Sequence, residues 1–230
     1  MKIVYFDLDN TILDFDKCER EALKDLMIHY NLEFSDDHLS SYSEINKKCW
    51  QDYERGLLSK EKLREERFKI FFRSKNIEIK NNMNPAKDYL EFLKEKSYFI
   101  PGAERLLKKL KEKNHKMACL TNGIKEVQSR RTKKANLDEY FDFILTSEEI
   151  GKPKPDPLIF ERASEISGIE LKDSLYIGDS LSSDFLGAEN AGVEFILFWN
   201  KPLSILKKEK RIPKNICTNF SDLYNMIREI

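Results

Sequence analysis

Cysteine and histidine are scarce in this 230-residue sequence, which has four of the first and three of the second. The cysteines are Cys18, Cys49, Cys119 and Cys217; they form no C-x-x-C pair, and the histidines show no metal-ligand spacing. This scatter argues against a framework of cysteines that bind a metal or form disulfides. We expect reduced, mostly buried thiols, as in a protein of the cytoplasm.

Long apolar runs and an excess of one charge are also missing. No apolar stretch approaches the roughly 20 residues that a transmembrane helix needs. Met1-Lys2 precedes only four apolar residues before Asp7, so we expect no secretory signal. Forty basic residues balance forty acidic ones, so no overall field draws the chain to nucleic acid or membrane. We therefore expect no nucleic acid polymer and no membrane as a partner.

A short apolar run, Ile3 to Phe6, is followed directly by two aspartates. The run is rich in β-branched and aromatic residues, which predicts a buried strand. Side chains two residues apart leave a strand on one face, so Asp7 and Asp9 are expected to point the same way. Two carboxylates about 4–5 Å apart repel by a few kcal/mol at an effective dielectric of about 20, a cost that a cation would offset. Alone, the Asp7-to-Thr11 segment is equally consistent with a capped turn.

Residues 14–97 show a helical pattern with no strand signal. Four amphipathic helices are predicted, with starts near Asp16, Ser35, Ser59 and Asn84. Asp16 and Glu19 are predicted to form a capping box at the first helix. Four helices in roughly 80 residues indicate a small helical bundle.

After Pro101-Gly102, predicted strands alternate with helices. The expected strands are residues 116–120, 141–146, 174–177, 195–199 and 216–217, and a closing helix is expected over Leu223 to Ile230. Lys201 to Lys214, Arg130-Arg131 and Lys133-Lys134 are expected to be solvated. The alternation predicts parallel βαβ units with right-handed crossovers. The predicted fold is α/β, a doubly wound, Rossmann-like parallel sheet from residues 1–13 and 98–230, with residues 14–97 inserted as a helical cap.

Three further polar segments lie at or just beyond predicted strand ends, where open α/β sheets bind ligands. Thr121-Asn122-Gly123 offers a hydroxyl, an amide and a glycine backbone, although such a turn is common. The segment from Gly178 to Asp184 offers two acids, although acids at this position also cap helices. Lys154 lies in a proline-stiffened loop that would hold its ammonium group in place, although an isolated lysine is usually solvated.

Taken together and in order, these segments resemble the motifs of the haloacid dehalogenase-like (HAD) superfamily of phosphohydrolases. The matching residues are Asp7, Asp9 and Thr11 for D-x-D-x-T, Thr121 for a strand-end Thr or Ser, Lys154 to Phe160 for K-P-x-P-x-I-F, and Gly178, Asp179 and Asp184 for G-D-x-x-x-x-D. Lys152 fits only the first four positions of the third motif, so Lys154 is the preferred match. The resemblance covers essentially the whole chain, with the helical cap between the first two motifs.

Within that superfamily, four short stretches look most like the bacterial 5'-nucleotidases, which act on pyrimidine and noncanonical nucleoside monophosphates. These stretches are Thr11 to Phe15, Thr121 to Gly123, Gly178 to Asp184, and Asn190 to Gly192. A sugar-phosphate phosphatase and a phosphosugar mutase are alternatives, although the mutases typically have Glu-Asp at Gly178-Asp179. Dehalogenases and phosphonatases lack the second aspartate, so Asp9 argues against both. A non-enzymatic binding module is disfavoured because the motif residues are intact.

The resemblance implies a mechanism and a set of roles. Asp7 would be the nucleophile that forms an aspartyl phosphate, and Asp9 the general acid and base. Mg²⁺ would be held by the Asp7 carboxylate, the Asp9 main-chain carbonyl and Asp179. The remaining implied roles are phosphate binding for Thr121, Asn122 and Lys154, and orientation of a metal-bound water or Lys154 for Asp184. The implied protein is a monomer or homodimer that acts on a small phosphomonoester.

Overall fold

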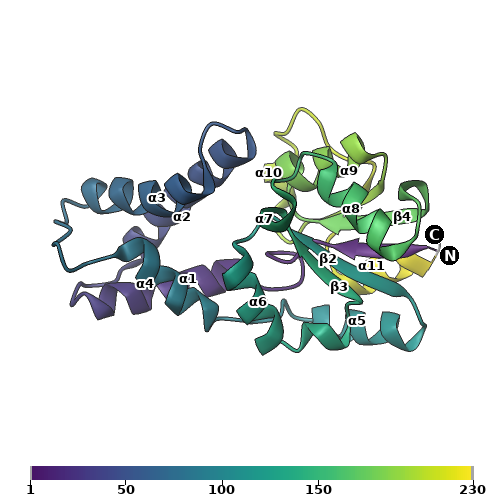
Figure 1. The fold of residues 1–230 in the computed structure, drawn as a ribbon, viewed down its shortest axis with the longest axis horizontal. Coiled ribbons are helices and arrows are strands. Elements are labelled where there is room, and N and C mark those ends of the chain that lie inside the picture. The colour runs from purple at the N-terminus through teal and green to yellow at the C-terminus, as the bar shows by residue number, and fades with distance from the viewer. Residues whose placement is uncertain (1, 229–230) are drawn as a thin grey trace. The chain divides into compact units, whose positions relative to one another are not determined.

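The computed structural model describes residues 2–228 and divides into two compact units (Figure 1). The larger unit contains the segment up to Asp14 and the chain from Tyr98 onward, and the smaller unit is Phe15–Ser97. Asp14 belongs to the larger unit, where its backbone N–H donates to the Tyr98 carbonyl at 2.8 Å. The predicted division assigns this one residue to the helical segment instead.

The larger unit is built on a six-stranded parallel sheet with the order β3-β2-β1-β4-β5-β6. The strands are β1 (Ile3–Phe6), β2 (Lys116–Thr121), β3 (Phe143–Thr146), β4 (Ser174–Gly178), β5 (Glu194–Phe198) and β6 (Asn215–Cys217). The chain builds outward from β1 to β3 on one side, then returns to β4 on the other. This order confirms the predicted doubly wound sheet and puts its switch point at β1.

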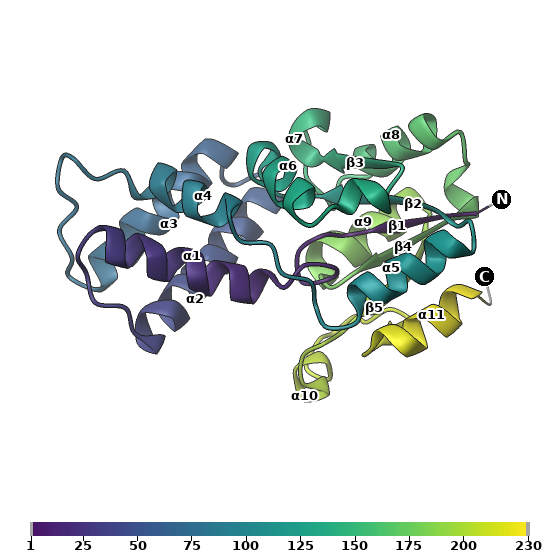
Figure 2. The same ribbon diagram turned by 90° about the horizontal axis from the view of Figure 1, so that it is seen from below.

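Helices cover both faces of this sheet. They are α5 (Ala103–Glu112), α6 (Lys125–Lys134), α7 (Ser147–Ile150), α8 (Leu158–Ser167), α9 (Leu186–Ala191), α10 (Leu203–Leu206) and α11 (Phe220–Arg228), with a π-helical turn at Leu181–Phe185. Val4 and Phe6 of β1 pack into one apolar cluster with α5 and α11, which lie side by side in Figure 2. Ile3 and Tyr5 pack into the opposite cluster with α8. Alternate residues of β1 therefore anchor opposite layers, which fixes the strand where Asp7 begins.

The smaller unit consists of the four predicted helices, α1 (Phe15–His29), α2 (Asp36–Glu54), α3 (Lys60–Ser74) and α4 (Pro85–Lys94). Ser35 and Ser59 cap α2 and α3, with each hydroxyl oxygen accepting from the backbone N–H three residues on. Asn84 caps α4 in the same way, and Pro85 occupies its first turn, where a missing N–H costs nothing. These caps explain why the starts of α2, α3 and α4 were predicted correctly from the sequence.

The predicted capping box of Asp16 and Glu19 is wrong. Helix α1 begins at Phe15, and the buried Glu19 carboxylate accepts hydrogen bonds from Ser43 Oγ and, at 2.7 Å, from Asn46 Nδ2 of α2. Glu19 faces the bundle interior, so its partners are tertiary and not the first turn of its own helix.

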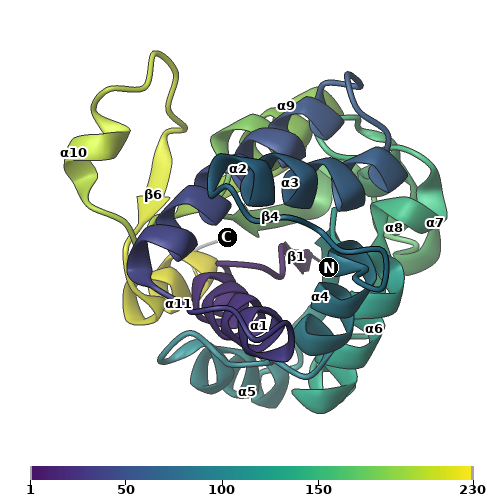
Figure 3. The same ribbon diagram turned by 90° about the vertical axis from the view of Figure 1, so that its left-hand side faces the viewer.

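Two predictions near the C-terminus also change. The segment Lys201 to Lys214 contains the short helix α10, which buries Leu206; Figure 3 shows α10 and the loop after it beside the edge strand β6. The closing helix starts three residues earlier than predicted, at Phe220, and Ile230 lies outside the described residues. Within residues 2–228, no helix combines the length and apolar character required to cross a bilayer.

Candidate active site

The polar strand ends meet at one edge of the sheet because β2, β1 and β4 are neighbours in it. Asp7 follows β1, Thr121 ends β2, and Asp179 follows β4. The Asp7 backbone N–H donates to the Ile177 carbonyl at 2.8 Å, which joins the loop that begins at Asp7 to the neighbouring strand β4.

Lys154 is the hub of this edge, and only 1% of its surface is exposed. Its Nζ donates to Asp7 Oδ1 and Asp184 Oδ1, both at 2.7 Å, and lies 2.9 Å from the Leu120 carbonyl. Burial lowers the pKa of Lys154, but Asp184 and Asp7 outweigh it and raise that pKa above its usual value. Lys154 is therefore a fixed cation beside Asp7, and the expectation for a solvated lysine does not hold here.

Asp7, Asp179 and Asp184 form an acidic cluster in which one oxygen from each lies within 4.8 Å of the others. Burial, with smaller contributions from Asp184 and Asp179, raises the pKa of the Asp7 carboxyl well above its usual range, against the opposing effect of Lys154. Lys201 Nζ also donates to Asp179 Oδ2 at 2.8 Å. Clustered carboxylate oxygens of this kind are the ligands that Mg²⁺ prefers, so the donor set fits a magnesium ion.

Protein donors engage both side-chain oxygens of Asp184. Oδ1 accepts from Lys154 and from the Tyr176 hydroxyl at 2.8 Å, and Oδ2 accepts from the Ser180 backbone N–H at 3.0 Å. A Cβ on residue 178 would lie 2.4 Å from Oδ2, so only glycine at position 178 lets Asp184 approach this closely. The arrangement suits a residue that orients Lys154, and that role of Asp184 stays a prediction.

Thr121 and Asn122 both lie at this edge, and their side chains are engaged differently. Thr121 Oγ1 accepts from the Gly123 N–H at 3.1 Å and from Gln128 Nε2 at 3.2 Å. The Asn122 amide binds the Lys154 backbone twice, donating to its carbonyl at 3.0 Å and accepting from its N–H at 2.8 Å. The Asn122 side chain therefore holds the loop that carries Lys154, and phosphate binding by Thr121 and Asn122 stays a prediction.

Asp9 contacts two residues of α6 that the sequence interpretation missed. Its Oδ1 accepts from Arg131 Nη1 at 2.6 Å, and its Oδ2 accepts from Gln128 Nε2 at 2.7 Å. The prediction that Arg131 is solvated is wrong, because its side chain is only 1% exposed. Val127 is the one apolar residue in α6 (Lys125–Lys134), so no apolar stripe marked the face that carries Gln128 and Arg131, and a charged run is usually taken to be solvated.

Tyr176 is a further residue that the motifs do not include. Its hydroxyl accepts from Lys154 Nζ at 2.5 Å and donates to Asp184. Burial first, and then Asp184, raise the pKa of Tyr176 well above its usual value, so the hydroxyl remains a donor. Tyrosine in a strand is ordinarily a packing residue, and no local pattern distinguishes this one.

Tyr176→Phe should lower the free energy of unfolding by about 1.5–3 kcal/mol, the range for a hydrogen bond to a charged group. Tyr5→Phe is the matched control, because Tyr5 is the register partner of Tyr176 on β1 and its hydroxyl meets neutral serine hydroxyls, with Ser167 Oγ at 3.1 Å and Ser174 beside it. The control should lose about 0.5–1.5 kcal/mol. Urea unfolding of both variants measures the difference; equal losses would contradict the charged network at Tyr176.

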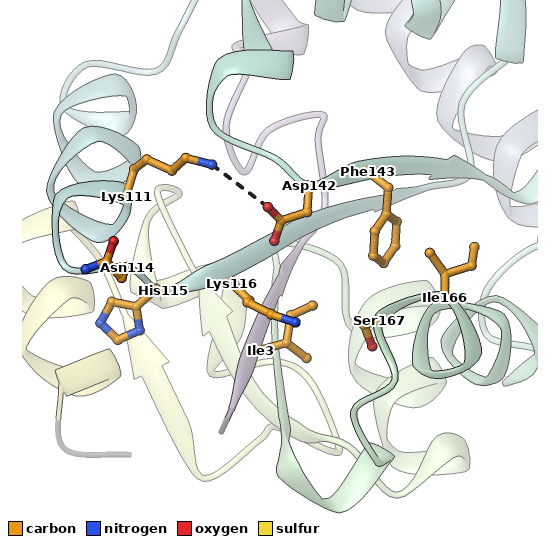
Figure 4. Close-up of a pocket in the computed structure, with 9 residues that line it drawn as sticks. All are labelled: Ile3, Lys111, Asn114, His115, Lys116, Asp142, Phe143, Ile166 and Ser167. Atoms are coloured by element: carbon orange, nitrogen blue, oxygen red, sulfur yellow. Dashed lines mark ion pairs between the residues drawn. The ribbon is translucent and has the colours of Figure 1, made fainter.

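A cavity of about 480 Å³ lies at the opposite ends of these strands (Figure 4). Ile3 and Lys116, the first residues of β1 and β2, line it together with Asp142, which forms an ion pair with Lys111 at 3.9 Å. Among the described residues the acidic cluster lies at the other edge, so this cavity is separate from the candidate site.

Comparison with known proteins agrees with this geometry. Residues 4–198 match the model of the haloacid dehalogenase-like hydrolase family. The chain is 32% identical to pyrimidine 5'-nucleotidase PynA of Streptococcus pneumoniae, over 98% of this chain and 94% of PynA. It is also 32% identical to pyrimidine 5'-nucleotidase YjjG of Escherichia coli, over 83% and 82% of the two chains. The solved structure of the HAD-hydrolase YfnB of Bacillus subtilis bound to magnesium superposes with a TM-score of 0.87 at 28% identity, covering 99% and 98% of the chains.

Proposed function

Since the chain belongs to the haloacid dehalogenase-like hydrolase family, we propose that it is a Mg²⁺-dependent 5'-nucleotidase acting on nucleoside monophosphates. The observation that carries the phosphatase assignment is the Asp7–Lys154–Asp184 arrangement beside Asp9 and Asp179. The narrower substrate class is supported by the two relatives named pyrimidine 5'-nucleotidase.

In the first step the Asp7 carboxylate attacks phosphorus, and an O–P bond forms as the bond to the alcohol oxygen breaks. Asp9 gives its proton to the departing alcohol. In the second step Asp9 takes a proton from water, whose oxygen bonds to phosphorus as the aspartyl phosphate breaks. The products are the nucleoside and inorganic phosphate, with both aspartates restored.

We expect Lys154 and the turn at Thr121 and Asn122 to hold the non-bridging phosphate oxygens as charge moves during transfer. A fixed ammonium and preorganised N–H donors in a poorly solvated site stabilise such charge more strongly than water does. The strong anchoring of Lys154 means that little reorganisation is needed at the moment of reaction.

Charge balance supports a divalent cation. Three carboxylates face two lysines, Lys154 and Lys201, and a phosphate dianion adds two further negative charges. The carboxylates of Asp7 and Asp179 and the main-chain carbonyl of Asp9 would hold Mg²⁺. The ion would offset this charge and favour the ionised form of Asp7, whose pKa burial raises.

The smaller helical unit is proposed to serve as the cap that selects the substrate and excludes water. A cytoplasmic location and a monomeric or homodimeric state stay predictions. Dehalogenase activity is disfavoured because a departing halide needs no proton, and Asp9 would then have no role. A phosphosugar mutase is disfavoured by Gly178 in place of the glutamate typical of that class.

A phosphomonoester panel tests the proposal. With Mg²⁺, the protein should hydrolyse p-nitrophenyl phosphate, and EDTA should slow turnover by about 10²-fold or more, since a catalytic metal contributes several kcal/mol. Nucleoside monophosphates should exceed sugar phosphates in kcat/KM by about tenfold or more. A preference for sugar phosphates would refute the nucleotidase assignment, and no turnover of any phosphomonoester would refute the phosphatase assignment.

A further inference from the structure

We propose that Gln128 and Arg131 of α6 are positioning residues that orient Asp9 for proton transfer. The inference rests on the proposed function, because it assigns a purpose to the acid–base role of Asp9. Both residues belong to the same unit as Asp9, and neither is part of the four motifs.

The two contacts fix the plane of the Asp9 carboxylate. Arg131 holds Oδ1 at 2.6 Å and Gln128 holds Oδ2 at 2.7 Å. With one donor on each oxygen, rotation about the last side-chain bond would break at least one short hydrogen bond. A carboxylate oxygen has two lone pairs, so each oxygen keeps a second position, which can carry the proton for the departing alcohol or accept a proton from water. The Asp9 side chain remains 24% exposed, which leaves that position accessible.

Gln128 connects this pair to the phosphate-binding turn. Its Oε1 accepts from Arg131 Nη1 at 2.9 Å, and its Nε2 lies 3.2 Å from Thr121 Oγ1. A Cβ on residue 123 would lie 2.0 Å from Gln128 Nε2, so glycine at this position leaves the space that the amide occupies. The hydrogen bonds that link Thr121, Gln128 and Arg131 therefore fix the position of the Asp9 carboxylate relative to the place where phosphate is expected.

The Arg131–Asp9 ion pair does more than stabilise the fold, because of the acid that Arg131 contacts. Burying a guanidinium group is costly unless a carboxylate and further hydrogen bonds compensate it. A purely structural arginine would be served by any acid, whereas Arg131 uses the residue proposed to transfer the proton. Displacements near 1 Å at such groups can cost about 10²-fold in rate, so an anchored carboxylate has a direct kinetic consequence.

The test compares two leaving groups. Asp9→Asn, Arg131→Ala, Arg131→Lys and Gln128→Ala are assayed by kcat/KM, which reports the steps up to alcohol release. One substrate is a nucleoside 5'-monophosphate, whose alkoxide leaving group must be protonated as it departs. The other is p-nitrophenyl phosphate, whose phenolate leaving group departs with little help from a proton donor. Asp9→Asn and Arg131→Ala should lose about 10²-fold on the nucleotide, the scale of general acid catalysis, and at least about tenfold less on the aryl ester.

Further readouts separate orientation from folding. Arg131→Lys keeps the charge and should recover part of the loss, and Gln128→Ala should lose about tenfold on the nucleotide with KM little changed. Arg130→Ala is the matched control on the same helix, because Arg130 is exposed; it should behave as wild type on both substrates.

Equal losses on the two substrates in a folded Arg131 or Gln128 variant, or no loss, would overturn the inference. If Arg131→Ala does not fold, Arg131→Lys and Gln128→Ala decide by the same criterion. A wild-type protein inactive on both esters would instead refute the proposed function, so the two failures are distinguishable.

Discussion

Asp7→Asn should reduce turnover of every phosphomonoester by about 10⁴-fold or more, because an amide cannot act as the nucleophile. The side chain keeps its size, so the strand and the Lys154 contact region should remain folded. Steady-state hydrolysis of p-nitrophenyl phosphate with Mg²⁺ measures the loss, and circular dichroism checks the fold.

Asp142→Asn is the matched control, since it makes the same chemical change at the opposite edge of the sheet. Its activity should stay within a factor of about two of wild type, in line with the small effect of surface substitutions. Substantial residual turnover in Asp7→Asn, with the fold retained, would remove Asp7 from the nucleophilic role.

Lys154→Met should lower the free energy of unfolding, measured in EDTA, by about 3–5 kcal/mol. Removing one partner of a buried ion pair leaves the other charge uncompensated, and here Asp7 and Asp184 both lose the ammonium group 2.7 Å away. Activity should fall as well, because the fixed cation that would face the phosphate is gone. Urea denaturation and p-nitrophenyl phosphate turnover measure the two losses.

Lys152→Met is the control within the same loop. The Lys152 side chain is largely exposed, and its Nζ lies 3.3 Å from Asp156 Oδ2 in a solvent-exposed ion pair. It should change the free energy of unfolding by no more than about 0.5 kcal/mol. Adding Asp184→Asn to Lys154→Met should recover part of the lost stability, because one uncompensated charge is removed. Equal effects of the two lysine variants would mean that Lys154 is not the buried cation of the site.

The fold and the backbone of the site could be predicted because both depend on patterns along the chain. Apolar runs mark buried strands, alternation with helices makes the sheet parallel, and parallel strands end at one shared edge. Asp7, Thr121 and Asp179 had to meet once those strands paired. Ser35, Ser59 and Asn84 were equally predictable, because an N-cap is satisfied by a backbone N–H three residues away.

Side-chain partners from distant elements could not be predicted in this way. The sequence by itself determined that an acid pair, a strand-end threonine, a lysine and a second acid pair lie at predicted strand ends or in the loops just beyond them, and the family resemblance implied that they form one site. Only the tertiary structure decided that Arg131 and Gln128 hold Asp9, that Tyr176 links Lys154 to Asp184, and that Glu19 turns inward. The contacts of Arg131, Gln128 and Glu19 depend on how a helix is rotated on its sheet or against its neighbour, and the Tyr176 contact depends on how the Lys154 loop and the Asp184 turn fold back onto β4. Helix rotation is set by the packing of many side chains at once, whereas strand-end position is set by local order along the chain.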